Sequence, residues 1–360
     1  MRTIVIGMAF FILVVVTFTS GRVEKEIVDE INIATAIGID AAKENEIKGT
    51  VVIPVFLADQ SIENASFEGK SVLAREVVNE LQNKSADPLV TGGIRVALYG
   101  EEVAKKGINE YVDALQRDAS IGSRVFLAVV DGEASEILTK TLGNRGTGTY
   151  LRDMLSHNMN RRDLPEMNLH LFVFRYYTKG MDPFLPYIKL IEDKVEIKGL
   201  AIFKEEKMID VVDQDNLFFF KALVQNFGEG THTVYLEEED EYASIKRIVS
   251  KRKIKVEEVN GDPKVTVQVY LQGVLSEYSG RKTDEGTVQA IISELEKEII
   301  YRSEKLIKKY QKMNADPIGI GYFAQSTLRG FDEEKWRNGY PDVEIKVEAE
   351  VDLIQTGIIE

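Results

Sequence analysis

The order of apolar and polar positions predicts strands that alternate with helices in the first half of the chain. Two apolar runs, 31–40 and 50–57, flank a polar turn and predict a β-hairpin. Helical spacing of apolar residues predicts helices over 71–81 and 101–116, and short apolar runs predict strands over 94–99, 125–130 and 169–177. This alternation indicates β-sheets that are covered by helices.

Two prolines mark a change of pattern near the middle of the chain. Pro183 and Pro186 interrupt regular structure, and we place a domain boundary close to them. Beyond them, the pattern predicts a hairpin over 195–212 and a short helix over 215–226.

The last third of the chain has the clearest periodicity. Apolar and polar residues alternate over 265–272 and again over 343–352, as in strands that have one buried face. Between them, an apolar stripe at helical spacing predicts a helix over 287–313, which would be about 40 Å long. This pattern predicts a sheet with one long helix packed on it.

Together these elements predict an α+β or α/β fold of three domains, each a β-sheet flanked by α-helices, after an N-terminal hydrophobic segment. The predicted divisions are a signal or membrane-anchor segment (1–21), an N-terminal sheet-and-helix domain (22–190), a small middle domain (191–240) and a C-terminal domain with the long helix on an antiparallel sheet (241–360).

The first residues have the composition of an export signal. Met1 and Arg2 precede an apolar run from Thr3 to Thr19, and small residues then lead to Arg22. A helix of that run would cover roughly 26 Å, slightly less than a bilayer core of about 30 Å, so a cleaved signal and an uncleaved anchor both fit it. In either case we expect the rest of the chain to lie outside the cytoplasm.

Composition narrows the classes of function. The chain has no cysteine, which excludes disulfides, thiolate metal sites and cysteine catalysis. Its formal net charge of −14 disfavours binding to nucleic acid. Charged residues make up 29% and hydrophobic residues 44%, so we expect most of the chain to be folded.

Two features have residue types that suit binding sites. The glycine-rich turn Gly143–Gly148 precedes a predicted helix, and its N–H groups could bind an anion, but it lacks the lysine and hydroxyl residue of a P-loop, so a linking turn is favoured. The histidines His157, His170 and His232 are too widely spaced for a metal-binding motif and are interpreted as ordinary surface or satisfied side chains.

Two other groups are interpreted without a chemical role. Ser156 and His157 lie beside Asp153, but neighbours on one helix point in different directions and no G-x-S-x-G motif occurs, which disfavours a hydrolase triad. The acidic run Glu237–Glu241 lacks the EF-hand pattern and is interpreted as a solvated loop. We therefore assign no catalytic, cofactor-binding or metal-binding residue, and no cofactor.

A basic stretch stands out in this acidic chain. Six lysines and arginines lie between Lys246 and Lys255. They suit either a basic edge that faces lipid headgroups or acidic loops of a partner, or a solvated strand with alternating lysines, and both interpretations stay open.

Three motifs, taken in their order and spacing, resemble the Ger(x)C family, the C subunits of nutrient germinant receptors of spore-forming bacteria. The first is INIATAIGID at 31–40, the second is GLAIFK at 199–204 with Lys207 and Met208, and the third is DPIGIG at 316–321 with Trp336, Pro341 and Gly357 downstream. They extend over nearly the whole exported part of the chain.

The resemblance implies a non-enzymatic, lipoprotein-like subunit of three α/β-type domains on the outer face of the spore inner membrane. Its implied partners are the multi-pass A and B subunits of the receptor, with the small-molecule germinant bound by those partners. Members of the family are attached through a lipidated cysteine, whereas this chain has Arg22 at about that position. We therefore expect the segment Thr3–Thr19 to be retained as the anchor.

The sequence thus predicts a membrane-associated, non-catalytic subunit of a germinant receptor complex that triggers spore germination. The alternative from a different class is an extracytoplasmic solute-binding protein that holds a small molecule between two domains.

Overall fold

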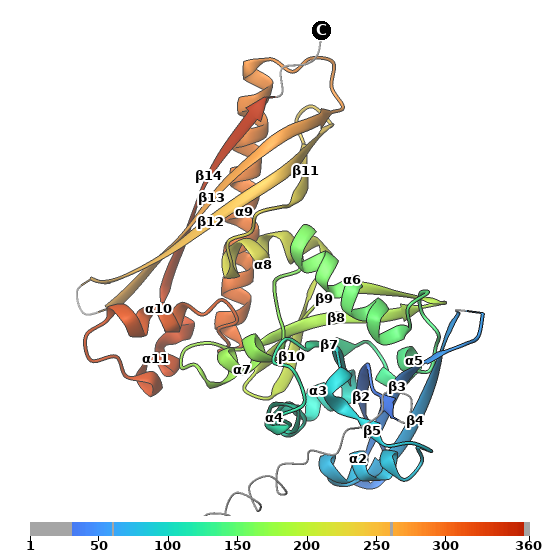
Figure 1. Ribbon diagram of the computed structural model, residues 1–360. Helices are drawn as coiled ribbons and strands as arrows, with labels where there is room; N and C mark the ends of the chain where they lie inside the picture. Colours follow the sequence, from blue (N-terminus) through green and yellow to red (C-terminus); the bar gives the residue numbers. More distant parts are fainter. Residues whose placement is uncertain (1–30, 60, 260–261, 356–360) are drawn as a thin grey trace, which may run out of the picture.

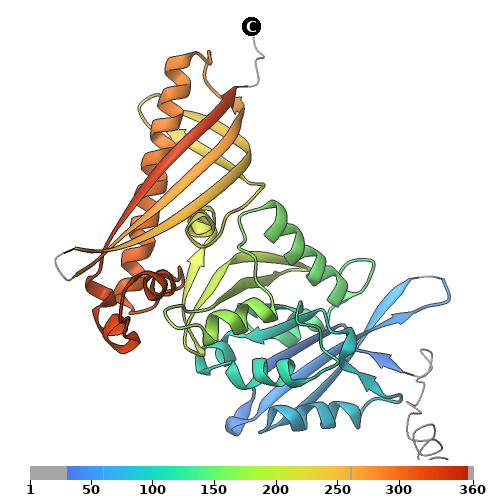
Figure 2. The same ribbon diagram turned by 60° about the vertical axis from the view of Figure 1, so that its left-hand side comes forward.

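The computed structural model describes residues 31–59, 61–259 and 262–355, which form a large sheet with helices and a smaller sheet with one long helix (Figures 1 and 2). The mixed fold of sheets flanked by helices agrees with the predicted class. A two-stranded sheet of β1 (Asn32–Ile33) and β5 (Leu89–Val90) lies where the described chain begins. The predicted signal or anchor segment, 1–21, lies outside the described residues.

The large sheet has a parallel centre with antiparallel hairpins on both sides. Its strand order is β10-β9-β8-β7-β6-β2-β3-β4, and the four central strands run parallel. The predicted hairpins β2–β3 and β9–β10 are both present. The strand bounds are β2 (Ala36–Ala41), β3 (Ile47–Phe56), β4 (Ile62–Ser71), β6 (Val96–Gly100), β7 (Phe126–Val130), β8 (Phe184–Ile191), β9 (Lys194–Lys204) and β10 (Lys207–Asp213).

Glycines let helices approach both faces of this sheet closely. A Cβ on Gly49 would lie 2.1 Å from Val77 Cγ1 of α2 (Ala74–Gln82), and a Cβ on Gly38 would lie 2.6 Å from Leu138 of α5 (Ala134–Leu138). Ile39 pairs with Gly49, so Gly38 faces the opposite side of the sheet, because neighbouring residues in a strand alternate between faces. The sheet is therefore covered on both faces, and its central strands are almost wholly buried.

The predicted helix over 101–116 is divided into two. α3 (Glu101–Lys106) ends at Gly107, whose φ of +133° does not continue a helix, and α4 (Asn109–Arg117) starts anew. The other helices of this part are α6 (Thr147–Arg161) and α7 (Leu169–Tyr177). Short 3₁₀ turns occur at Lys43–Asn45, Thr91–Gly93, Gln214–Asn216 and Tyr340–Asp342.

The prediction of a strand over 169–177 was wrong, because this segment is the helix α7. Its apolar run is too short for periodicity to separate a buried strand from a buried helix. The side chain of Asn168 decides the conformation: it accepts a hydrogen bond from Leu171 N at 2.9 Å and caps the first turn. Leu169, Phe172 and Arg175 are then buried at helical spacing.

The prediction that Pro183 and Pro186 interrupt regular structure was wrong for Pro186, which lies inside β8. β7 pairs with β8 only from Tyr187 onwards, so the missing N–H of Pro186 removes no hydrogen bond on that side. The residues predicted as a small middle domain, 191–240, provide β9 and β10 to the large sheet and β11 to the smaller one. The boundaries of the three domains stay a prediction.

The smaller sheet has the order β11-β12-β13-β14 and is covered by α9 (Glu285–Lys312). It was predicted to be antiparallel, but β13 and β14 are parallel, because α9 and the helices after it form a crossover between them. Glu296 of α9 accepts a hydrogen bond from Val351 N at 3.0 Å and so protects the edge of β14. The bounds are β11 (Thr231–Leu236), β12 (Glu241–Val259), β13 (Asp262–Tyr278), β14 (Glu344–Gln355), α8 (Leu217–Val224), α10 (Ile320–Thr327) and α11 (Glu333–Gly339).

Candidate functional site

Two loops interlock where the large sheet meets the C-terminal part. One loop, 178–183, follows α7, and the other, 313–319, follows α9. Asp182 N donates to Asp316 O at 2.9 Å, and Asp316 N donates to Asp182 Oδ2 at 2.6 Å. Tyr322 N donates to Gly180 O at 3.0 Å. We call this contact the junction.

The carboxylate of Asp316 organises the second loop. Its two oxygens accept hydrogen bonds from Gly319 N at 2.8 Å and from Gly321 N at 2.7 Å, and the side chain is buried. Burial raises the pKa of Asp316 to about 6, and the negative charge of Asp182 adds to this, although the backbone N–H donors lower the pKa in part. The site therefore holds an acid whose charge changes near neutral pH.

Two arginines bring positive charge to this acid. Arg175 of α7 is buried, donates hydrogen bonds to the carbonyl oxygens of Asp182 and Pro317, and lies 4.6 Å from the centre of the Phe184 ring. Burial lowers the pKa of Arg175 to about 10, so the guanidinium stays charged at neutral pH.

Arg252 of β12 approaches from the C-terminal sheet. It donates to Leu223 O at 2.6 Å and lies 5.4 Å from the centre of the Phe323 ring. Burial lowers the pKa of Arg252 to about 10, and attraction to Asp316 opposes this shift. The junction is thus a buried, charged contact between the two parts of the chain.

Glycines allow the two loops to come this close. A Cβ on Gly180 would lie 2.4 Å from the carbonyl carbon of Gly321, and a Cβ on Gly321 would lie 2.6 Å from Trp336 Nε1. Gly180 also has a φ of +72°, which side-chain residues rarely adopt. Close packing therefore explains the glycine at 321, the last residue of DPIGIG.

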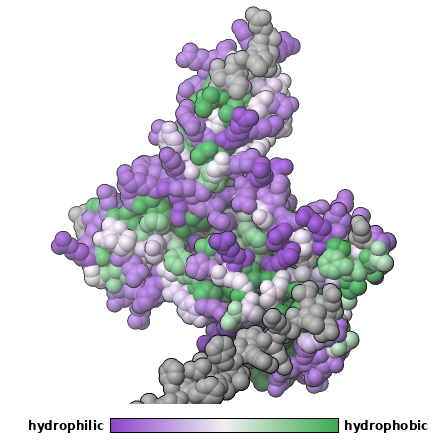
Figure 3. Space-filling model, viewed as in Figure 1, coloured by the Kyte–Doolittle hydropathy of each residue, from purple (hydrophilic) through white to green (hydrophobic). Residues whose placement is uncertain are grey.

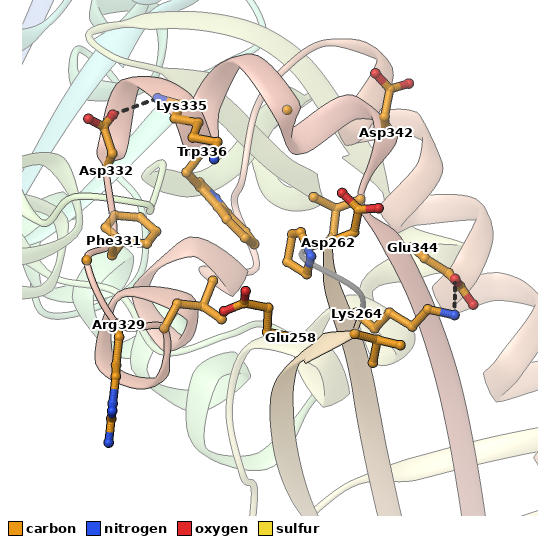
Figure 4. A pocket seen from close by; sticks show the side chains of 16 residues that line it. Glu258, Asp262, Lys264, Arg329, Phe331, Asp332, Lys335, Trp336, Asp342 and Glu344 are labelled. Atoms are coloured by element: carbon orange, nitrogen blue, oxygen red, sulfur yellow. Dashed lines mark hydrogen bonds and ion pairs between the residues drawn. The ribbon is translucent and has the colours of Figure 1, made fainter.

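Trp336, the single tryptophan of the chain, separates the junction from an open cleft. The cleft has a volume of about 790 Å³ and lies between the end of the β12–β13 hairpin and the region of α10 and α11 (Figure 4). Side chains of both charges line it, and Lys264 Nζ pairs with Glu344 Oε2 at 2.8 Å across its wall. The labelled lining residues are Glu258, Asp262, Lys264, Arg329, Phe331, Asp332, Lys335, Trp336, Asp342 and Glu344.

The glycine-rich turn Gly143–Gly148 contacts another part of the chain. It links α5 to α6, and Thr147 N at the start of α6 donates to Asn64 Oδ1 of β4 at 3.2 Å. In return, Asn64 Nδ2 donates to Thr147 Oγ1 at 2.8 Å. The N–H of Thr147, which an anion at this turn would need, is therefore already hydrogen-bonded to the β3–β4 hairpin.

The three histidines lie apart from one another. His157 on α6 and His170 on α7 are exposed. His232 on β11 stacks on the Phe218 ring at 4.4 Å between ring centres, and its Nε2 lies 3.1 Å from Glu298 Oε2 of α9. Across the residues that the structure describes, no cluster of three or more His, Asp or Glu side chains could hold a metal ion.

Asp153, beside Ser156 and His157 on α6, pairs with other residues. Its carboxylate contacts Arg145 Nη2 at 2.9 Å and also Arg152. The acidic run Glu237–Glu241 forms the exposed turn between β11 and β12 and the first residue of β12. These groups are not brought together with the junction.

The basic stretch divides between the two faces of β12. Lys251, Lys253 and Lys255 are exposed, whereas Arg252 points to the other face and reaches the junction. All six charges lie on β12, which suits both interpretations, and three of them form an exposed row. The partner of this row stays a prediction.

The buried cations Arg175 and Lys221 were not predicted from the sequence. Lys221 of α8 donates to Met159 O at 3.0 Å, and burial lowers its pKa to about 8. Each of them is the one lysine or arginine in a run of mostly apolar residues, LHLFVFRYY for Arg175 and LFFFKALV for Lys221. This pattern could have indicated them, because a charge in such a run is buried together with its neighbours.

No helix within the described ranges is long and apolar enough to span a bilayer.

Comparisons with known proteins match both parts of the chain. The family description "Spore germination protein N-terminal domain" matches residues 24–190, and "Spore germination B3/GerAC like, C-terminal" matches residues 198–357. The spore germination protein GerQC of Bacillus cereus is 28% identical over 354 residues, which cover 97% of this chain and 98% of that protein.

The fold resembles a solved structure. The crystal structure of the GerBC protein superposes with a TM-score of 0.59 at 14% identity and covers 88% of this chain and 96% of that chain. At this identity the likeness concerns the fold alone.

Proposed function

This chain belongs to the Ger(x)C family of spore germination proteins, and we propose that it is the non-catalytic, membrane-associated C subunit of a nutrient germinant receptor complex. In this proposal it lies on the outer face of the spore inner membrane and contributes binding surfaces for other subunits.

The observation that carries the proposal is that the three motifs by which the chain resembles the family hold its fold together. Asp40 of the first motif is buried and accepts hydrogen bonds from Ala134 N at 2.6 Å and Ser135 N at 2.9 Å, which caps α5. Gly199 of the second motif lets β9 approach β10, since a Cβ there would lie 1.8 Å from Val212 O. Asp316 of the third motif organises the junction. A shared architecture of this kind suits a protein that assembles with others.

Membrane attachment is proposed to use the apolar segment Thr3–Thr19. Thioether lipidation requires a cysteine, and the chain has none and carries Arg22 at about the lipidation position. An uncleaved apolar helix holds a protein at least as firmly as acyl chains do. The body would then stay within reach of the membrane without a lipid.

The proposed partners are the multi-pass A and B subunits, with the germinant bound by those subunits. The exposed row Lys251, Lys253 and Lys255 is a surface on which acidic loops of a partner would fit by charge.

Deletion of this chain in its spore-forming host tests the function. We expect the deleted spores to lose the response to the nutrient that the receptor detects, and the full-length chain to restore it. A chain that starts at Val23 should fail to restore the response, because it lacks the anchor. Spores that respond normally to every nutrient after the deletion would contradict the proposal.

The cleft beside Trp336 favours one second candidate, a solute-binding protein. Its volume of about 790 Å³ is within the usual range of small-molecule pockets. Because Trp336 is the only tryptophan and lines this cleft, its fluorescence responds to a molecule that binds there. A saturable fluorescence change and a thermal shift on titration with amino acids or sugars would support the solute-binding function, and the absence of both would favour the scaffold.

A further inference from the structure

The β3–β4 hairpin ends in an apolar tip. The strands pair as far as Phe56 and Ile62, and the three consecutive residues Val55, Phe56 and Leu57 are exposed by 36%, 75% and 37%. We call these three residues the tip. Hydrophobic side chains gather at the right-hand extremity of the molecule, where Figure 1 places the hairpin (Figure 3). Among the described residues, Phe56 is the most exposed large hydrophobic side chain.

The stem of this hairpin is fixed to the body. The paired hydrogen bonds between Asn64 and Thr147 join it to the start of α6, and a Cβ on Gly146 would lie 3.5 Å from Pro54 Cβ. The start of α6 therefore supports the hairpin, and the tip projects beyond these hydrogen bonds.

The tip lies at the end of the sheet where the described chain begins. Ala36 pairs with Val52 in antiparallel register, and Thr35 N donates to Val52 O at 2.8 Å. The residues that precede Ala36 therefore lie on the side of Val52 that leads along β3 to the tip. Figure 2 shows the start of β1 and the hairpin on the same side of the molecule, away from the C-terminal sheet.

The chain that precedes this end is short. Residues 20–30 separate the apolar segment Thr3–Thr19 from the described body, and even fully extended they span at most about 40 Å. If the segment is in the bilayer, this end of the sheet lies close to the membrane surface.

We propose that Val55, Phe56 and Leu57 insert into the interfacial region of the same membrane, as a second contact beside the anchor. This inference rests on the proposed membrane attachment. The occupant is lipid, because three consecutive residues at the end of a narrow hairpin offer less area than a stable protein interface requires. The insertion is driven by burial of apolar surface and has little dependence on salt.

The polar residues of the hairpin agree with a shallow insertion. Asp59 accepts hydrogen bonds from Ser61 N at 3.0 Å and Ser61 Oγ at 2.6 Å, which lower the pKa of Asp59, so it stays charged. Asp59 and Glu63 would remain at headgroup level and would be repelled by anionic lipids. The tip therefore needs no anionic lipid.

The absence of cysteine makes a direct test possible. The variant Leu57→Cys, carried in the full chain, is labelled with an environment-sensitive fluorophore and reconstituted into phosphatidylcholine vesicles. Val72→Cys is the matched control, since Val72 is also an exposed apolar residue (62%), just beyond the opposite end of β4 and about 30 Å away. We expect the label at 57 to show blue-shifted emission, quenching by spin-labelled lipids and severalfold lower quenching by iodide than the label at 72.

The outcomes separate this inference from the proposed attachment. A chain that floats with the vesicles and carries a water-exposed label at 57 would overturn the inference alone. A label that leaves water only when partner subunits are added would also overturn it, in favour of a protein contact. A chain that fails to float with the vesicles would overturn the attachment and the inference together. Thermal unfolding of both variants confirms that they are folded.

Discussion

Asp182 and Asp316 are joined by two hydrogen bonds. Asp182 N donates to the carbonyl oxygen of Asp316 at 2.9 Å, and Asp316 N donates to the carboxylate of Asp182 at 2.6 Å. Neither loop can therefore move without breaking hydrogen bonds of the other loop. Because one loop follows the helix before β8 and the other follows α9, this pair couples the large sheet to the C-terminal sheet.

Arg175→Met should weaken this coupling. Removing the guanidinium leaves the carbonyl groups of Asp182 and Pro317 without their donor and removes one of the positive charges near two buried carboxylates, so we expect a loss of about 3 kcal/mol in the free energy of unfolding. Urea unfolding measures this change. Arg145→Met is the control, because Arg145 forms an exposed ion pair with Asp153 that is worth less than about 1 kcal/mol. Equal stabilities of the two variants would contradict the assigned role of Arg175.

The pKa of Asp316 predicts a dependence of stability on pH. Its pKa is raised from 3.8 to about 6 in the folded protein, so the folded state binds the proton more tightly than the unfolded state does. The contribution of Asp316 to the free energy of unfolding is fully present below about pH 4 and is lost as the pH rises through 6. The expected loss is roughly 3 kcal/mol.

The comparison of wild type with Asp316→Asn isolates this effect. Other buried carboxylates also titrate, so the informative quantity is the difference between the two pH profiles, measured by urea unfolding followed through Trp336 fluorescence. Asn loses an acceptor for the N–H groups of Gly319 and Gly321, so the variant is less stable throughout, but its profile should fall less between pH 4 and pH 7. Parallel profiles would show that Asp316 does not titrate in this range.

Gly321→Ala should disturb the packing between the junction and the cleft. The added Cβ would lie 2.6 Å from Trp336 Nε1 and 2.7 Å from Gly180 Cα, closer than real contacts allow. We expect a loss of about 1–3 kcal/mol together with a change in Trp336 emission. Gly122→Ala is the control, because a Cβ there would meet nothing within 4 Å. An unchanged emission maximum in Gly321→Ala would argue against the close packing of Trp336.

Reversal of charge at Lys251 and Lys253 tests the exposed row on β12. The double variant with Glu at both positions should reduce co-purification of membrane partners at low salt, with a smaller difference at high salt, because screening weakens exposed charge contacts. Lys105 and Lys106 on α3 are also exposed and provide a control double reversal. Identical recovery of partners with both double variants would remove the role of this row.

The long periodic elements could be predicted from the sequence because their burial is one-sided. α9 buries Val288, Ile291, Leu295 and Ile299 on one stripe, and β13 buries alternate residues, so the period alone identifies them. The anchor segment was predicted from its composition, but it lies outside the described residues.

The junction could not be predicted, because its residues come from segments with no common pattern. Arg175 lies in an apolar run whose helical form depends on the cap at Asn168, and Arg252 was grouped with exposed lysines although it faces the opposite side of β12. The contact of Asp182 with Asp316 joins residues that are distant in the chain, and only the three-dimensional fold brings them together.

The most direct test of the proposed function is to crosslink intact spores that carry a tagged full-length chain, purify it from solubilised spore membranes and identify its neighbours by mass spectrometry. We expect recovery in the membrane fraction with the N-terminal segment retained and with multi-pass membrane proteins among the crosslinked neighbours. Recovery in the soluble fraction, with a mature N-terminus near Arg22 and no membrane protein attached, would contradict the proposed function.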